Sequence, residues 1–155
     1  MGWRGLYYEH KFPVHIFRLS GIYGPGRSVL DRVRMDEARR IEKPNHLFGR
    51  IHVDDIVGVL RASMAKPDAG AVYNLADDEP SAPGDVIAYA CELLGVDPLP
   101  AVPFEEAAKE MTTMGLSFWR DNRVVSNRRL KDDLGYTLKY PDYRSGLKSI
   151  VDAGG

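Results

Sequence analysis

Apolar residues recur at two different spacings along the chain, and these spacings separate predicted strands from predicted helices. Residues 14–19 and 71–75 are short and mostly apolar, and they are rich in β-branched and aromatic side chains, which is typical of buried strands. The first of them runs directly into a loop rich in glycine and proline. Residues 39–42 and 47–53 flank a turn at residues 43–46, a pattern that predicts a hairpin.

Helical spacing is clearest over residues 83–94, where a proline lies in the first turn and Gly95 follows the last apolar position. A second helix is predicted over residues 55–65, with Asp54 as its N-cap. Its predicted buried face consists of Ile56, Val59, Leu60 and Ser63. Shorter helices are predicted after Ser28, over residues 104–111, from Ser126 or Asn127 to Gly135, and from Tyr143.

Composition limits the class of protein. The 155 residues, 44% hydrophobic and 28% charged, suffice for one compact unit. The net charge of −1 gives no overall attraction to nucleic acid or an anionic membrane, and no stretch has the length of a membrane span. The single cysteine, Cys91, excludes an internal disulfide. We therefore expect a cytoplasmic protein that binds neither nucleic acid nor membrane.

Four sequence motifs occur in an order and at a spacing that resemble those of a known protein superfamily. Residues 17–27 read Phe-Arg-Leu-Ser-Gly-Ile-Tyr-Gly-Pro-Gly-Arg, and residues 50–56, 72–78 and 127–135 carry further motifs at matching spacing. Together they resemble the extended short-chain dehydrogenase/reductase superfamily, also called the NAD-dependent epimerase/dehydratase family. Residues 140–147 look most like an atypical bacterial branch of it.

The resemblance implies an α/β fold of the Rossmann type with two lobes. The chain is expected to be the carboxy-terminal substrate lobe, with the amino-terminal dinucleotide-binding lobe missing. Residues 14–155 would form this lobe with the last strands of the sheet, and residues 1–13 would be the end of a truncated helix or a divergent start. A misassigned gene start is a further explanation for the missing lobe.

The family implies NAD or NADP as cofactor, but this chain alone is not expected to bind either. No Gly-x-x-Gly-x-x-Gly or Gly-x-Gly-x-x-Gly occurs, so no fingerprint loop brings a helix amino end to a pyrophosphate. Tyr7 and Lys11 match the catalytic Tyr-x-x-x-Lys of the superfamily. Only two residues separate Lys11 from the strand at 14–19, too few to finish the long helix that carries this pair, so the catalytic residues stay unassigned.

Ser20, Gly21, Ile22 and Tyr23 are the candidate cofactor-binding residues, because they follow a predicted parallel strand at the end where α/β sheets bind ligands. A purely structural turn is the alternative.

Arg27, Arg50, His52, Arg123 and Asn127 are the candidate substrate-binding residues. Arg50 and His52 alternate with apolar residues and share one strand face, which suits an anion, although a surface arginine beside a stacked histidine fits equally well. UDP-sugar enzymes of the family carry an arginine where this chain has Phe48 and an asparagine where it has Gly21. Both departures argue against a UDP-sugar.

Acidic and histidine residues carry weaker signals. Asp54 is interpreted as a helix cap, and Asp77, Asp78 and Glu79 as a solvated turn. The histidines lack carboxylates at ligand spacing, so no metal site is expected.

Two functions follow. The first is the substrate-lobe portion of an NAD(P)-dependent epimerase/dehydratase-like protein, acting on a sugar nucleotide or related small molecule and inactive alone. The alternative is a cofactor-free binding or protein-interaction module, in which the seam left by the missing lobe mediates self-association.

Overall fold

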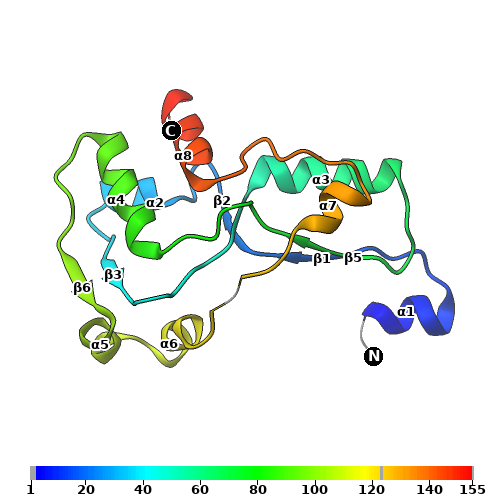
Figure 1. The fold of residues 1–155 in the computed structure, drawn as a ribbon, viewed down its shortest axis with the longest axis horizontal. Coiled ribbons are helices and arrows are strands. Elements are labelled where there is room, and N and C mark those ends of the chain that lie inside the picture. Colours follow the sequence, from blue (N-terminus) through cyan, green and yellow to red (C-terminus); the bar gives the residue numbers. More distant parts are fainter. Residues whose placement is uncertain (1–2, 123, 155) are drawn as a thin grey trace.

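The computed structural model describes residues 3–122 and 124–154, in which short strands alternate with helices (Figure 1). The strands are β1 (Ile16–Leu19), β2 (Gly21–Tyr23), β3 (Arg40–Glu42), β4 (Arg50–His52), β5 (Val72–Leu75) and β6 (Ala101–Pro103). The helices are α1 (Trp3–His10), α2 (Val29–Arg34), α3 (Val53–Ala65), α4 (Pro83–Leu94), α5 (Phe104–Ala107), α6 (Thr113–Arg120), α7 (Arg128–Asp132) and α8 (Tyr143–Asp152), with a 3-10 turn at Ala108–Glu110.

The strands of the described residues pair in parallel and in twos. β1 pairs with β5, β2 with β4, and β3 with β6. The chain passes from β1 to β2 through Ser20 alone and changes its partner strand there. The described residues therefore form a mixed α/β architecture with three parallel strand pairs and no single wide sheet.

The predicted hairpin at residues 39–53 is wrong. β3 and β4 do not pair with each other, because each finds a parallel partner elsewhere in the chain. The intervening His46 is buried and stacks on Trp119, with the ring centroids 5.2 Å apart. This contact pulls the connecting segment toward α6 instead of closing a tight turn.

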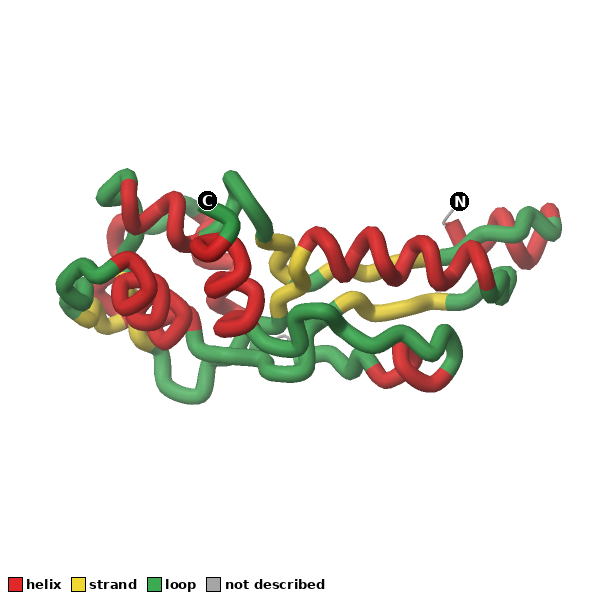
Figure 2. Tube along the Cα trace, turned by 90° about the horizontal axis from the view of Figure 1, so that it is seen from above, coloured by secondary structure: helices red, strands yellow, loops and turns green. Residues whose placement is uncertain are grey.

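Two hydrophobic cores lie at opposite ends of an elongated molecule (Figure 2). The first, which we call the α4 core, joins α2, α4 and α8 through residues such as Leu30, Ala90 and Leu147. The second, the α3 core, joins α3, β5 and α7 through residues such as Val59, Tyr73 and Leu130. Residues 20–23 and 49–52 connect the two ends.

Local signals placed several helix ends correctly. Ser28 caps α2 in a capping box with Asp31, whose carboxylate accepts hydrogen bonds from the Ser28 amide (2.7 Å) and hydroxyl (2.8 Å). α4 begins at Pro83 and ends at Leu94, and the following C-cap Gly95 has a left-handed φ of 64°, as expected for a glycine cap. The segment 104–111 is helical only to Ala107, after which it tightens into the 3-10 turn.

The prediction that Asp54 caps α3 is wrong. The N-cap is His52, whose Nδ1 accepts a hydrogen bond from the Asp54 amide at 3.2 Å. Asp54 lies in the first turn instead, where its carboxylate pairs with Lys139 Nζ at 2.8 Å. An acidic first turn still suits the positive helix end.

The buried face of α3 also differs from the predicted one. Val59 and Ser63 are buried as expected, but Leu60 is exposed and Asp55 is completely buried. Asp55 accepts hydrogen bonds from the Tyr136 hydroxyl (2.9 Å) and from the amides of Lys139 (2.7 Å) and Tyr140 (3.0 Å). A buried carboxylate is tolerated because these donors replace water.

Within the described part of the chain, no helix has the length and apolar character needed to cross a membrane.

Candidate functional site

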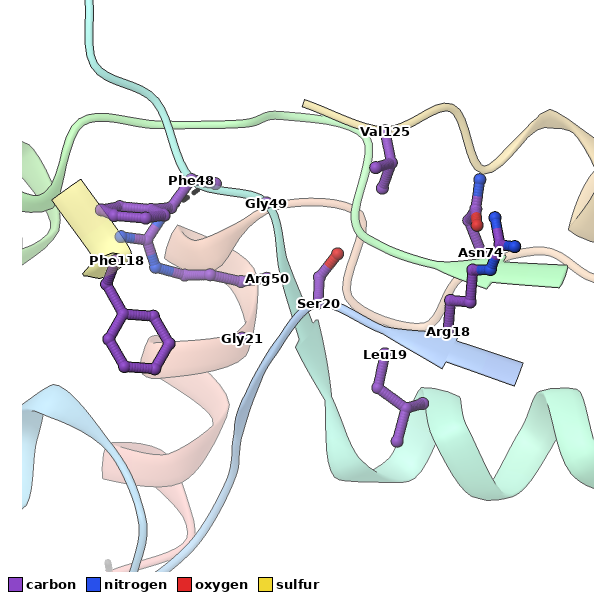
Figure 3. Close-up of a pocket in the computed structure, with 10 residues that line it drawn as sticks. All are labelled: Arg18, Leu19, Ser20, Gly21, Phe48, Gly49, Arg50, Asn74, Phe118 and Val125. Atoms are coloured by element: carbon purple, nitrogen blue, oxygen red, sulfur yellow. Dashed lines mark hydrogen bonds between the residues drawn. The ribbon is translucent and has the colours of Figure 1, made fainter. Parts of the chain in front are cut away.

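A pocket of about 550 Å³ lies where β1 passes into β2 (Figure 3). Its position follows from the fold, because the β1 carboxyl end and the segments before β4 and α7 converge there. It is lined by Arg18, Leu19, Ser20, Gly21, Phe48, Gly49, Arg50, Asn74, Phe118 and Val125. One end of the pocket carries a cationic and an amide side chain, and the other end carries two aromatic rings.

The polar end consists of Arg18 and Asn74. These residues are register partners in the parallel pair of β1 and β5, so their side chains project from the same face of the sheet (Figure 3). The Asn74 amide nitrogen donates to the Ser126 carbonyl at 3.2 Å. Arg18 is exposed, and none of the described residues forms a hydrogen bond or ion pair with its guanidinium. It is therefore available to an anionic ligand.

The aromatic end consists of Phe48 and Phe118. The neighbouring Trp119 packs edge-on against Phe48, with centroids 5.8 Å apart, and stacks on His46. The Lys43 ammonium donates to the Trp119 carbonyl and lies 4.5 Å above the Phe104 ring. This cluster holds α6, and with it Phe118, against the pocket.

Arg50 lies at the aromatic end, where the protein already uses part of its guanidinium. Its Nη1 donates to the Phe48 carbonyl (3.1 Å) and to the Ser81 hydroxyl (2.7 Å), which ties β4 to the start of α4. Burial lowers the pKa of Arg50 below its ordinary value. The side chain borders the pocket and at the same time braces its wall.

The candidate cofactor-binding residues divide between the pocket and the protein interior. Ser20 and Gly21 line the pocket. Ile22 packs against the α3 core, and Tyr23 is buried in the α4 core. Burial raises the pKa of the Tyr23 hydroxyl well above its usual range, which keeps this phenol neutral.

The candidate substrate-binding residues are similarly scattered. Arg27 is exposed beside a separate shallow hollow that it shares with Ile22. His52 is buried at the start of α3, with its ring 4.2 Å from that of Tyr140, and burial lowers its pKa. Asn127 donates to the Ala76 carbonyl (2.9 Å), so its amide supports the turn after β5. Arg123 lies outside the described residues.

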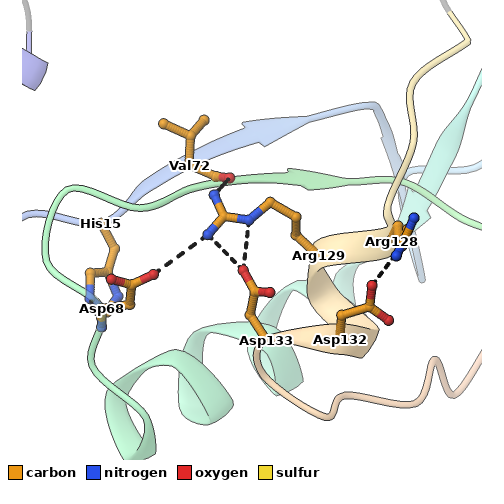
Figure 4. A network of polar contacts seen from close by, with 7 residues as sticks. All are labelled: His15, Asp68, Val72, Arg128, Arg129, Asp132 and Asp133. Carbon is orange, nitrogen blue, oxygen red and sulfur yellow. Dashed lines mark hydrogen bonds and ion pairs between the residues drawn. The ribbon is translucent and has the colours of Figure 1, made fainter.

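Arg129 attaches α7 to β5 (Figure 4). Arg129 donates to the Val72 carbonyl at 3.0 Å and pairs with Asp133 at 2.6 Å. Its guanidinium also lies 5.0 Å from the centre of the Tyr73 ring. Arg128 pairs with Asp132 one turn along the helix. These contacts position the segment that carries Val125 over the pocket.

The prediction of a solvated acidic turn after β5 holds for Asp78 and Glu79, which are exposed, but not for Asp77, which is only 3% exposed. Its Oδ1 accepts a hydrogen bond from the Arg50 amide at 3.2 Å, while Oδ2 has no partner among the described residues. Burial raises the pKa of Asp77 to about 7, and the Arg50 contacts oppose this shift. Asp78, by contrast, pairs with Lys131.

The loop at residues 24–27 does not fit a dinucleotide pyrophosphate. Its Gly24 and Arg27 amides donate to each other's carbonyls, at 3.1 and 3.0 Å, and Pro25 has no amide proton. Few backbone donors are therefore left for a phosphate. Tyr7 and Lys11 do not line the pocket either.

Sequence reasoning missed Arg18, Asn74, Phe118 and Val125. A signal for two of them was present, since Arg18 and Asn74 are single polar residues near the ends of otherwise apolar strands. Their pairing depends on the register of β1 against β5, which the sequence does not reveal. Phe118 and Val125 reach the pocket through tertiary packing of a segment distant in sequence.

Comparisons with known proteins agree on the fold. No protein family profile matches the chain. A solved structure of a functionally unknown conserved protein from Silicibacter pomeroyi DSS superposes with a TM-score of 0.87 at 53% identity, covering 92% of this chain and 50% of that one. Protein YeeZ of Escherichia coli K12 is 25% identical over 138 residues, covering 86% of this chain and 44% of that protein.

Enzymes of known class share the fold at lower identity. The dTDP-glucose 4,6-dehydratase from Bacillus anthracis, solved in complex with NAD, gives a TM-score of 0.71 at 18% identity, covering 96% of this chain and 46% of that one. The chain thus spans about half the length of the proteins that it matches. Over the part that superposes, its fold is similar to that of this dehydratase and of a human epimerase family protein solved with NADPH.

Proposed function

We propose that this chain forms the substrate-binding part of an NAD(P)-dependent enzyme of the epimerase/dehydratase type. Its substrate would be a sugar nucleotide or a related small molecule, and the chain would have no activity by itself. The pocket at the β1–β2 junction carries the proposal, because an arginine without a partner among the described residues, a carboxamide and two aromatic rings border about 550 Å³. Phosphate and carboxylate ligands suit such a cation, and planar or sugar rings suit the aromatic end.

Calorimetry with dTDP-glucose, NADH and NADPH tests this proposal directly. We expect dTDP-glucose to bind and both dinucleotides to fail at micromolar concentrations, because the 24–27 loop uses its own amide donors. Arg18→Gln should weaken dTDP-glucose binding by about tenfold, the loss of one charge-assisted contact at an exposed site.

The matched control is Arg27→Gln, since Arg27 is also exposed but lies outside the pocket. It should leave the dissociation constant unchanged. Micromolar binding of either dinucleotide would contradict the proposal. The absence of measurable dTDP-glucose binding at millimolar concentration would also contradict it, as would an equal effect of the two substitutions on the dissociation constant.

A further inference from the structure

The buried carboxyl group of Asp77 lies next to Arg50, which borders the pocket. Two hydrogen bonds join the two residues. The Arg50 amide donates to Asp77 Oδ1 at 3.2 Å, and the Asp77 amide donates to the Arg50 carbonyl at 2.6 Å. These bonds hold the turn after β5 against β4, so the Asp77 carboxyl group has a fixed place beside a pocket residue.

The surroundings of Asp77 favour a neutral carboxyl group. Its Oδ2 is buried and has no partner among the described residues. The charged and titratable groups that face it come from β4, β2, the segment before α8 and its own turn: Arg50, Tyr23, Asp142 and Asp78. Burial raises the pKa of Asp77 to about 7, Arg50 opposes this rise, and the two other carboxylates add to it. Asp77 therefore changes its charge near neutral pH.

The Arg50 guanidinium still has donors available to a ligand. Its Nη1 donates to Phe48 and Ser81, whereas Nε and Nη2 donate to no described residue. Figure 3 shows this guanidinium on the same side of the pocket as the rings of Phe48 and Phe118. Burial lowers the pKa of Arg50, and the charge of Asp77 opposes this more than any other neighbour does. Asp77 is therefore the main counter-charge of this cation.

We propose that the protonation state of Asp77 sets the affinity of the pocket for anionic ligands. A neutral Asp77 leaves the positive charge of Arg50 uncompensated, whereas an ionised Asp77 cancels part of it and repels an anion bound there. The affinity for an anion should therefore fall as the pH rises through the titration of Asp77. By linkage, a bound anion in turn holds the proton on Asp77. The inference rests on the proposed function, because it concerns the same pocket.

Calorimetry of the full chain with dTDP-glucose at about pH 5.5 and 8.5, at constant ionic strength, tests the inference. The diphosphate of this probe is esterified at both ends, so it lacks the ionisation near pH 6 that a terminal phosphate has. We expect the dissociation constant to be about tenfold higher at the upper pH, a usual size for coupling between two sites.

Two variants assign this pH dependence to one carboxyl group. Asp77→Asn has no charge at position 77, so it should bind dTDP-glucose at both pH values with nearly the wild-type affinity of the lower pH. The matched control is Asp78→Asn, because Asp78 lies in the same turn but is exposed. It should keep the wild-type pH dependence. All histidines remain in both variants, so their titration does not distinguish them.

Nuclear magnetic resonance of carboxyl carbons follows Asp77 directly in the wild-type chain, with Asp77→Asn identifying its signal. Saturating dTDP-glucose should raise the pKa of Asp77 by about one pH unit, the equivalent of a tenfold change in affinity. Sulfate at about 100 mM is the second probe, because it keeps its charge across this range. Compared with chloride at the same ionic strength, it should also raise the pKa of Asp77.

The outcomes separate this inference from the proposed function. If dTDP-glucose binds with an affinity that does not change with pH, or if Asp77→Asn keeps the pH dependence, the inference is wrong and the proposed function stands. If dTDP-glucose binds at neither pH, the proposed function is wrong and sulfate decides the inference. A pKa of Asp77 that sulfate raises would then support it, and an unchanged pKa would overturn it.

Discussion

The two buried carboxylates of Asp55 and Asp77 differ in how many hydrogen bonds they accept. Asp55 receives three hydrogen bonds from one stretch of backbone and side chain before α8. Asp77 receives one backbone hydrogen bond at Oδ1, and its Oδ2 is buried without a partner among the described residues. The first carboxylate fixes a contact between α3 and residues 136–140, whereas the second carries an electrostatic cost at neutral pH.

Asp55→Asn should lower the free energy of unfolding by about 2 kcal/mol, because an amide group would face donors that a carboxylate now satisfies. Urea denaturation at neutral pH measures this loss. Asp54→Asn is the matched control, since it removes only an exposed ion pair with Lys139 and should have a much smaller effect. Equal losses in the two variants would contradict the structural role of Asp55.

Asp77 should make stability depend on pH. Its pKa is about 7 in the folded chain and 3.8 ordinarily, so between these values the folded state binds the additional proton. The stabilisation is complete below about pH 4 and is lost as the pH rises through 7. Asp77→Asn cannot titrate, so the difference in unfolding free energy between wild type and variant should fall across this window. The expected fall is a few kcal/mol, about 1.4 kcal/mol per pKa unit.

Urea titrations of both proteins at pH 4, 6 and 8 measure this difference. His46 and His52 also titrate, but they are present in both proteins and cancel in the comparison. A difference that is constant with pH, or that grows as the pH rises, would refute the assignment to Asp77.

At the scale of elements, close approach between side chain and backbone decides how α8 docks. Gly146 lies against the Tyr23 ring, and a methyl group there would overlap the Tyr23 hydroxyl. Tyr23 therefore joins β2 to α8 in two ways: its ring fits closely against Gly146, and it is buried in the α4 core. The absence of a side chain at position 146 is a packing requirement.

Gly146→Ala should destabilise the protein by about 1–3 kcal/mol, the usual range for overpacking. Intrinsic helix propensity alone predicts the opposite sign, because alanine is favoured over glycine by about 1 kcal/mol. Gly115→Ala in α6 is the matched control, since its added methyl group meets no atom closer than 3.4 Å. Thermal unfolding followed by circular dichroism distinguishes the two, and a stabilised Gly146→Ala variant would count against this packing.

Element identity was largely predictable from sequence, whereas element pairing was not. The helix at 83–94 with its Gly95 cap and the strands near 16–19 and 72–75 follow from local periodicity. The hairpin prediction failed because strands of three residues, such as β3 and β4, carry too few side chains to specify a partner. Their parallel pairing is stabilised by helices that pack on them from elsewhere in the chain.

At the scale of the whole molecule, the pocket gathers segments that are far apart in sequence. Ser20 and Gly21 could be proposed from the sequence because they follow a strand at the end where α/β folds bind ligands, and Arg50 because it alternates with apolar residues of a strand. Arg18 with Asn74 required the β1–β5 register, and Phe118 required the aromatic contacts of Trp119.

The sequence by itself determined the alternation of strands and helices, the caps of α2 and α4, the absence of a glycine fingerprint and the likeness to epimerases and dehydratases. These properties depend on residues close together along the chain or on ordered motifs. Only the tertiary structure decided which strands pair, that Asp55 and Asp77 are buried, and which side chains share the pocket. Each of these depends on contacts across many residues, where burial and register select among arrangements that local propensity leaves nearly equal in energy.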